Sequence, residues 1–142
     1  MNIYSEKMQV TAMLPEDDLC IMTDVSRLKQ VLVNLLNNSR KFTKEGYINL
    51  GYTLLEQEKQ VELFVEDTGE GIAGEHLEHI FERFYKVNSF KQGTGLGLSI
   101  CLTIVEHLLG TISVNSEMGR GTRFTVRLPL GLDESINICL GV

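Results

Sequence analysis

The sequence has little of several residues that would support particular classes of protein. Its 142 residues include no tryptophan, two prolines and three cysteines. The cysteines, Cys20, Cys101 and Cys139, are odd in number and far apart, and none forms a CxxC motif or a Cys/His pair at metal-ligand spacing. This pattern argues against a structural zinc site or a disulfide framework and favours reduced, buried thiols in a cytosolic protein.

Basic clusters and long apolar runs are also missing. Lysine and arginine total 13 against 19 aspartates and glutamates, which gives a formal net charge of -6. A nucleic-acid interface requires a basic face, so we expect no nucleic-acid partner. No run approaches the roughly 20 apolar residues of a membrane span, and no signal peptide is present. We therefore expect no direct membrane contact by this domain.

The composition that remains is ordinary for a globular protein. Hydrophobic residues make up 43% of the chain and charged residues 23%, which disfavours disorder. The length suits a single domain, which we expect over residues 1–130. After Pro129 the pattern is weak, so residues 131–142 are expected to form a frayed tail.

The spacing of apolar residues predicts both helices and strands. Helical spacing predicts helices from an N-cap at Asp24 to Phe42, over Gly74–Tyr85, and from the glycine-rich loop Gly93–Gly97 to Leu109. Alternation predicts strands near Met8–Met13, Leu19–Met22, Ile48–Leu54, Gln60–Asp67, Thr111–Asn115 and Thr122–Leu128. This order predicts an α+β fold, a two-layer α/β sandwich with one mixed, mostly antiparallel sheet and about three helices on one face.

The first predicted helix has an unusual polar stripe. Steps of three or four residues place the following side chains on one face: Arg27, Gln30, Asn34, Asn38 and Lys41. Asparagine is a poorer helix former than the glutamate and lysine that usually cover a solvated face. Amide oxygens suit a hard cation and a lysine suits phosphate. The alternative is a polar surface helix that happens to contain asparagines.

The segment Asp67–Ile72 has a second suggestive pattern. By strand parity the Asp67 carboxylate shares the apolar face of the preceding strand, where it needs hydrogen-bond donors such as an exocyclic amine. Gly69 and Gly71 would let the backbone pass close to a flat ligand. An ordinary turn with a hydrogen-bonded aspartate would give the same pattern.

A glycine-rich loop forms the third pattern, with the sequence Gly93-Thr94-Gly95-Leu96-Gly97-Leu98-Ser99. A loop that runs into a helix N-terminus presents free backbone N–H groups to phosphate. The glycine spacing is not that of a dinucleotide fingerprint, and no Gly-Lys-Ser/Thr follows as in a P-loop. A tight helix entry would seldom need three alternating glycines.

Together these segments resemble the histidine kinase catalytic domain of the GHKL ATPase superfamily, from about Asp24 to Pro129. Residues 24–43 resemble the asparagine box, 67–72 the first glycine box, 81–85 the phenylalanine box, 93–98 the second glycine box and 119–122 the last glycine motif. Each motif is a modest signal, but all of them in order are highly specific. The resemblance implies the Bergerat ATP-binding fold, with ATP and Mg²⁺ as cofactors.

The resemblance also implies roles for individual residues. Asn38, helped by Asn34, would hold Mg²⁺, and Lys41 would lie beside the phosphates. Asp67 would accept the adenine amine, and Arg83 would approach the γ-phosphate beside a short lid, Lys86–Gln92. The other residues expected at the nucleotide are Phe42, Gly69, Gly71, Ile72, Tyr85, Gly93, Thr94, Gly95, Leu96, Gly97, Leu98 and Thr122.

Two features bear on the reaction. ATP-hydrolysing members of the superfamily have a water-activating glutamate where this chain has Asn34, and an asparagine cannot act as that base. None of the three histidines, His76, His79 and His107, stands in the expected phospho-acceptor context. The resemblance thus implies a catalytic domain that phosphorylates a histidine on a separate dimerisation domain.

The implied parent is an inner-membrane two-component sensor, with this domain in the cytoplasm and a response regulator receiver domain downstream. Two alternatives share the motifs: an anti-sigma serine kinase, and a non-catalytic nucleotide-binding or docking module. The complete phenylalanine box and glycine loop favour the histidine kinase over the serine kinase. Intact Asn38, Asp67 and Arg83 weigh against the docking module.

Overall fold

The computed structural model describes residues 8–13, 20–21, 24–87, 96–130 and 138–139, and these form a two-layer α+β sandwich. The main sheet has five strands in the order β1-β3-β4-β6-β5. Its strands are β1 (Met8–Met13), β3 (Gly46–Leu55), β4 (Gln60–Asp67), β5 (Thr111–Glu117) and β6 (Gly121–Pro129). Only β1 and β3 are parallel; the other neighbouring pairs are antiparallel. The prediction of a mixed, mostly antiparallel sheet is confirmed.

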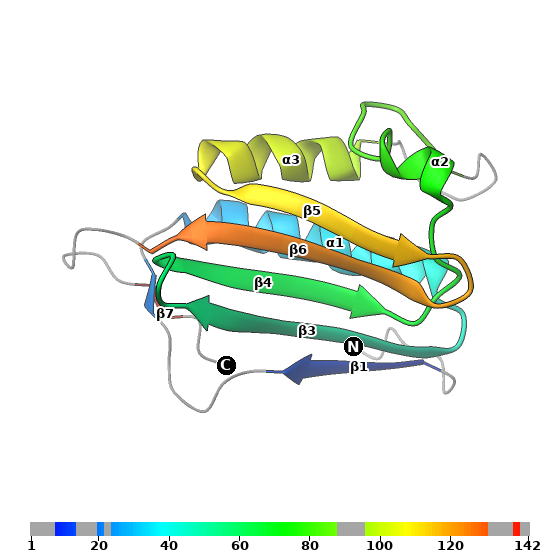
Figure 1. Cartoon of the computed structure of the whole chain (residues 1–142), viewed down its shortest axis with the longest axis horizontal. Helices are drawn as coiled ribbons and strands as arrows, with labels where there is room; N and C mark the ends of the chain where they lie inside the picture. Colours follow the sequence, from blue (N-terminus) through cyan, green and yellow to red (C-terminus); the bar gives the residue numbers. More distant parts are fainter. Residues whose placement is uncertain (1–7, 14–19, 22–23, 88–95, 131–137, 140–142) are drawn as a thin grey trace.

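Helices cover one face of this sheet. Figure 1 shows α1 (Val25–Phe42) behind the strands and α3 (Gly97–His107) beyond the β5 edge, while α2 (Gly74–Leu77) lies near the β5–β6 hairpin. The core lies between the two layers. Its fully buried side chains alternate along the strands and recur at helical spacing on α1; they include Val31, Leu35, Val61, Val65, Phe124 and Val126.

The first helix forms as its sequence predicts. Asp24 is the N-cap, and its Oδ1 accepts a hydrogen bond from the Arg27 backbone N–H at 3.2 Å. Such a cap satisfies one of the N–H groups that have no partner within a helix. Arg40 and Lys41 lie in the last turn, where positive charge complements the helix dipole. The helix therefore begins and ends at the predicted residues.

The second helix is shorter than predicted. A helix over Gly74–Tyr85 is wrong, because α2 ends at Leu77 and a series of tight turns follows. These turns are closed by i→i+3 backbone hydrogen bonds, such as His79 N to His76 O and Glu82 N to His79 O, both 2.9 Å. Apolar residues three apart suit such turns as well as an α-helix, so spacing alone does not separate them. The third helix ends at His107, two residues before the predicted end.

The C-terminal tail also departs from the prediction. Ile138–Cys139 forms β7, which pairs antiparallel with β2 (Cys20–Ile21) in a second, two-stranded sheet. In this register Cys20 lies opposite Cys139. A frayed end is therefore wrong for these two residues, while the rest of the tail lies outside the described residues.

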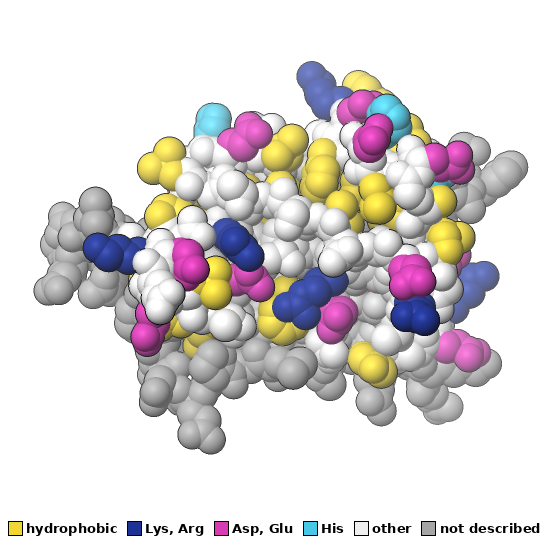
Figure 2. All heavy atoms as spheres, viewed as in Figure 1, with side chains coloured by type: hydrophobic (Ala, Val, Ile, Leu, Met, Phe, Trp, Pro, Cys, Tyr) yellow, Lys and Arg dark blue, Asp and Glu magenta, His cyan; other side chains and the backbone are white. Residues whose placement is uncertain are grey.

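The face of the main sheet that the helices leave uncovered is charged. Arg127 Nε donates to Glu62 Oε2 at 3.0 Å, and Arg123 lies 3.7 Å from Glu66. Arg123 also lies 4.0 Å from the centre of the Phe64 ring, a side chain that is only 7% exposed. Figure 2 shows acidic and basic side chains interspersed over this face. No helix in the described part of the chain is long and apolar enough to cross a membrane.

Candidate functional site

A buried carboxylate lies at the end of β4. Asp67 is 3% exposed and continues the core face of the sheet, with Thr122 of β6 and Ile48 of β3 as its register partners. Its Oδ1 accepts a hydrogen bond from the Gly69 backbone N–H at 2.9 Å. Burial raises the pKa of the Asp67 carboxyl above its usual value, and hydrogen bonding by Gly69 opposes this shift. Burial outweighs the groups that lower this pKa, and the Asp67 side chain points inward as the strand parity predicts.

Two buried hydroxyls from the C-terminal end of α1 lie beside this carboxylate. Ser39 is 0% and Thr43 4% exposed, and neither side-chain oxygen has a hydrogen-bond partner of ordinary length in the described structure. Both hydroxyls are still near enough to lower the pKa of Asp67. Buried polar atoms without partners cost about 1–3 kcal/mol each, and they mark a place where a water or a ligand completes the hydrogen bonding.

The turn after Asp67 packs against the backbone at the end of α1 and at the end of β5. A Cβ at Gly69 would lie 2.2 Å from the Phe42 carbonyl oxygen, and the Glu70 N–H donates to the same oxygen at 3.0 Å. Gly71 has φ +78°, and a Cβ there would lie 2.2 Å from the Glu117 carbonyl oxygen. Both glycines are therefore explained by close packing within the protein, whereas the sequence suggested close approach to a ligand.

A network of hydroxyls joins this turn to the β5–β6 hairpin. Ser116 Oγ accepts from the Ile72 N–H at 2.7 Å, donates to the Gly121 carbonyl at 2.9 Å, and lies 2.8 Å from Thr122 Oγ1. Because the one Ser116 proton goes to Gly121, Thr122 is the donor in the last contact. A hollow of about 490 Å³ lies at this end of the sheet, where Glu66, Arg120 and Arg123 line it together with Asp67, Ser116 and Thr122.

Sequence reasoning missed both Ser39 and Ser116. The only available signal for Ser116 is its parity with the inward-facing residues of the same strand. Ile72, by contrast, was expected at the base pocket. Its side chain is buried in the core, and its backbone N–H forms part of this network.

The polar stripe of α1 runs toward the first turn of α3. Asn34 Nδ2 donates to the Gly97 carbonyl at 3.4 Å, while Asn34 and Asn38 are half-buried and Lys41 is exposed. Next to them Cys101 is fully buried, and its thiol contacts the Val31 carbonyl oxygen at 3.7 Å. Burial raises the pKa of Cys101 to about 11, so this residue is the inert thiol that the sequence predicts.

In the described part of the chain, the first turn of α3 has no side-chain cap. Leu96 is the N-cap and provides no side-chain hydrogen bond, while Gly97 is exposed and Leu98 half-buried. The free N–H groups and the helix dipole at such an end favour negative charge. Gly93, Thr94 and Gly95 lie outside the described residues, as does the expected lid beyond Val87.

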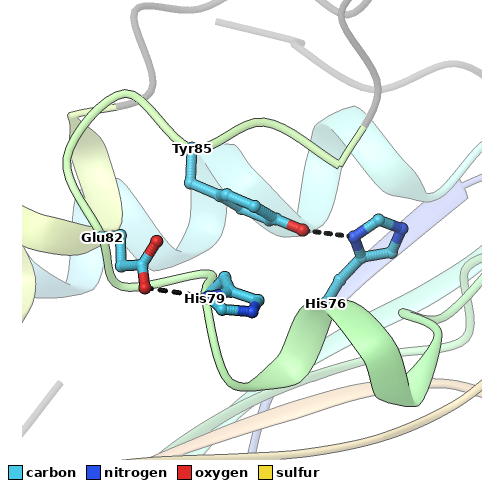
Figure 3. Close-up of polar contacts among 4 residues, drawn as sticks. All are labelled: His76, His79, Glu82 and Tyr85. Atoms are coloured by element: carbon cyan, nitrogen blue, oxygen red, sulfur yellow. Dashed lines mark hydrogen bonds and ion pairs between the residues drawn. The ribbon is translucent and has the colours of Figure 1, made fainter.

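The phenylalanine box forms the turns after α2. Arg83 is exposed, with its guanidinium carbon 5.6 Å from the centre of the Phe84 ring. Tyr85 is half-buried, and its hydroxyl lies 2.5 Å from His76 Nδ1 (Figure 3). The structure therefore joins Gly69, next to Asp67, to the end of α1, and it joins Gly71, Ile72 and Thr122 to the β5–β6 hairpin. It directs the Tyr85 hydroxyl to a histidine.

Comparisons with known proteins agree with this fold. Residues 23–132 match the family described as histidine kinase-, DNA gyrase B- and HSP90-like ATPase. The sensor protein SrrB of Staphylococcus aureus is 48% identical over 110 residues, which are 75% of this chain and 19% of that protein. The chain therefore spans 19% of the length of this curated relative.

Solved structures give the same result. The catalytic domain of histidine kinase ThkA superposes with a TM-score of 0.76 at 32% identity, over 87% of this chain and 80% of that one. Full-length ShkA in complex with AMPPNP gives a TM-score of 0.79 at 30% identity, over 87% of this chain and 26% of that one. The chain belongs to the histidine kinase-, DNA gyrase B- and HSP90-like ATPase family, and within it to the ATP-binding catalytic domains of sensor histidine kinases.

Proposed function

We propose that this domain binds Mg-ATP and presents the γ-phosphate to a histidine on a separate dimerisation domain of the same parent protein. The observation that supports this most is the buried Asp67 carboxylate, with the unpartnered hydroxyls of Ser39 and Thr43 beside it. This is a polar, enclosed place in an otherwise apolar core, and an adenine amine with a bridging water would satisfy it.

At this adenine end, Asp67 accepts the exocyclic amine of the base. Gly69 and Gly71 hold the turn against α1 and the β5–β6 hairpin, which fixes the direction of the carboxylate. Ile72 and Phe42 supply apolar surface to the base, and Thr122 lies beside Asp67 on the neighbouring strand. Recognition of the base thus uses residues that are already fixed by the fold.

At the phosphate end, Asn38 and Asn34 supply amide oxygens to Mg²⁺, and Lys41 supplies charge. The Asn34 amide nitrogen is used in the contact with Gly97, so its oxygen remains for the cation. The described residues contain no group of three or more His, Cys, Asp or Glu side chains that could hold a metal. A site of few, neutral oxygen ligands fits Mg²⁺, which keeps several waters and takes phosphate oxygens. When bound, the ion neutralises charge on the phosphates.

For the transfer itself, Arg83 and the N-terminal turn of α3 act on the phosphates. The segment Gly93–Leu98 brings backbone N–H groups to the phosphate chain, and Arg83 approaches the γ-phosphate as charge develops. Asn34 cannot act as a general base, so the site does not activate water and the phosphoryl group goes to a protein side chain. Positioning and charge neutralisation supply most of the rate.

The parent protein and its partners belong to the same proposal. Because this chain spans 19% of SrrB, the sensor segments, the dimerisation domain and the receiver domain of a response regulator are inferred from kinship with such sensor proteins. The domain would then lie on the cytoplasmic side of an inner-membrane sensor.

Thermal unfolding with and without Mg-ADP tests the proposal. At one hundred times its dissociation constant, a ligand adds about 2.7 kcal/mol to the unfolding free energy. We expect this shift in the wild type and in Glu66→Gln, a neighbouring change on the charged face, and no shift in Asp67→Asn. Absence of any shift in the wild type at millimolar Mg-ADP would contradict nucleotide binding.

The variant Asp67→Asn should separate binding from folding. The raised pKa of Asp67 means that the folded state loses stability as pH rises from the ordinary value of 3.8 through the raised one. Removing this charge therefore should not lower the unfolding midpoint of the nucleotide-free domain at neutral pH. A large fall in that midpoint would instead assign Asp67 a purely structural role.

A further inference from the structure

Three aromatic and imidazole rings meet beside Arg83. The Tyr85 ring contacts both His76 and His79, with ring centres 5.9 Å and 5.4 Å apart. Its hydroxyl lies 2.5 Å from His76 Nδ1, and His79 Nδ1 lies 2.8 Å from Glu82 Oε1. Figure 3 shows that the Tyr85 hydroxyl points at His76 across the turn, and that Glu82 reaches back to His79. We call His76, His79, Glu82 and Tyr85 the Tyr85 clamp.

The clamp spans the tight turns that follow α2. From His76 to Tyr85 the described backbone hydrogen bonds outside α2 include successive i→i+3 bonds, and the last of them, from Tyr85 N to Glu82 O, is 3.3 Å long. Phe84 has φ +65°, a left-handed conformation that costs energy for a bulky residue. Contacts with neighbouring residues must hold such a residue in place, and the hydrogen bond between His76 and Tyr85 spans it.

Arg83 therefore sits between two anchors. On its N-terminal side Ile80 is 4% exposed, and Phe81 meets Phe124 of the core edge to face, with ring centres 6.3 Å apart. On its C-terminal side Tyr85 packs against the core and is tied to His76. Arg83 itself is exposed, and Phe84 is 65% exposed. The direction of the Arg83 side chain depends on both anchors.

Acidic side chains lie beside both imidazoles. Glu82 and Glu78 face His79, and hydrogen bonding with Glu82 raises the pKa of His79. His76 Nε2 lies 3.6 Å from Glu75. A neutral His76 accepts the Tyr85 proton at Nδ1, whereas a protonated His76 donates to the Tyr85 oxygen, so this contact persists in both states.

We propose that His76 is a positioning residue: through its hydrogen bond to Tyr85 it fixes the turn that carries Arg83 toward the γ-phosphate. The inference rests on the proposed contact of Arg83 with that phosphate. In this proposal the Tyr85 hydroxyl binds His76, whereas the sequence resemblance implies that Tyr85 contacts the nucleotide.

The test compares the affinities of Mg-ADP and Mg-AMPPNP by titration calorimetry of the whole chain. If Arg83 contacts the γ-phosphate, we expect the wild type to prefer AMPPNP by about tenfold, the effect of one charge-assisted hydrogen bond. Arg83→Ala should abolish this preference and leave the affinity for ADP unchanged. His76→Leu and Tyr85→Phe should reduce the preference to nearly that of Arg83→Ala, again without changing the affinity for ADP.

Rescue and control variants exclude a general loss of structure. A glutamine carbonyl can accept the Tyr85 proton, so His76→Gln should restore most of the AMPPNP preference. His107→Gln, at the exposed end of α3, should behave as wild type. If His76→Leu and Tyr85→Phe both keep the wild-type preference while Arg83→Ala loses it, the inference is overturned and the proposed function stands. If Arg83→Ala has no effect, or the wild type binds no nucleotide, the proposed function fails and the inference with it.

Discussion

The two ends of the proposed nucleotide site are built differently. At the adenine end, Asp67, Ser39, Thr43 and Thr122 are each at most 5% exposed, and backbone hydrogen bonds tie the surrounding turn to α1 and to the β5–β6 hairpin. At the phosphate end, Asn34 and Asn38 are half-buried, whereas Lys41 and Arg83 are exposed. Among the described residues, a long hydrogen bond of 3.4 Å joins Asn34 of α1 to Gly97 at the start of α3.

The two ends differ in how much of the binding site is already built in the nucleotide-free protein. A buried carboxylate with a raised pKa and unpartnered hydroxyls are costly for the free protein, so the adenine end is prepared at the expense of stability. Exposed cations cost the free protein little, and phosphate adds to their interactions when it binds. Changes at the adenine end should therefore alter folding and binding together, while changes at the phosphate end should alter binding alone.

The largest effect is expected from Gly69→Ala. The new Cβ would lie 2.2 Å from the Phe42 carbonyl oxygen, which belongs to the backbone and cannot turn aside. We expect a loss of about 2–3 kcal/mol or more of unfolding free energy and loss of nucleotide binding, measured by urea unfolding and calorimetry. Gly74→Ala is the matched control, because a Cβ there would meet nothing within 4 Å. Equal stability of the two variants would show that the turn is not packed as described.

A smaller effect, confined to binding, is expected from Asn38→Ala. Loss of a metal ligand should weaken Mg-ADP binding by about tenfold or more, and should leave magnesium-free ADP binding and the unfolding midpoint unchanged. Asn37→Ala, one residue earlier on the exposed side of α1, is the control and should change neither affinity. If Asn38→Ala weakens binding equally with and without magnesium, the asparagine does not act through the ion.

Removing the buried hydroxyls of Ser39 and Thr43 should affect stability and nucleotide binding differently. Ser39→Ala and Thr43→Val remove buried polar atoms that lack partners, so each should leave the nucleotide-free domain equally stable or up to about 1 kcal/mol more stable. Each should also weaken ADP binding by about threefold to tenfold, because a hydrogen bond beside the base is lost. Ser113→Ala, on the exposed face of β5, should change neither quantity. A clear loss of stability in both variants would mean that the hydroxyls have partners in the free protein.

The smallest effect concerns the Tyr85 clamp. Hydrogen bonding with Glu82 raises the pKa of His79, so the stabilising pair is complete below the ordinary value near 6.5 and is lost as pH rises through the raised value. An NMR titration should give His79 a pKa above 6.5, and Glu82→Gln should return it toward that value. A His79 pKa unchanged by Glu82→Gln would contradict the contact.

Local signals in the sequence predicted most of this fold. Asp24 as a cap and the helical spacing up to Phe42 gave the bounds of α1, and alternation gave those of β4. The same spacing overextended α2, because tight i→i+3 turns and an α-helix share it, and nothing local marks the positive φ of Phe84. The pair β2–β7 was missed because its strands are far apart in sequence, so no local pattern reports the pairing.

Some features of the candidate site could likewise be predicted from the sequence, and others could not. The inward direction of Asp67 follows from strand parity and is confirmed by its burial. The packing roles of Gly69 and Gly71 depend on Phe42 and Glu117, which only the folded chain brings close. Ser39, Ser116 and the clamp of His76 on Tyr85 likewise arise from contacts between separate segments, so residue type and spacing could not identify them.

We propose above that the buried Asp67 carboxylate accepts a hydrogen bond from the exocyclic amine of adenine. The most direct test compares the dissociation constants of Mg-ADP and the magnesium complex of inosine diphosphate, which has a carbonyl oxygen in place of that amine. We expect the wild type to bind ADP about 10- to 100-fold more tightly, as for a hydrogen bond to a charged group. We expect Asp67→Asn to lose this preference. Equal binding of the two nucleotides by the wild type would contradict adenine recognition by Asp67, because Asp67 would then not face the base.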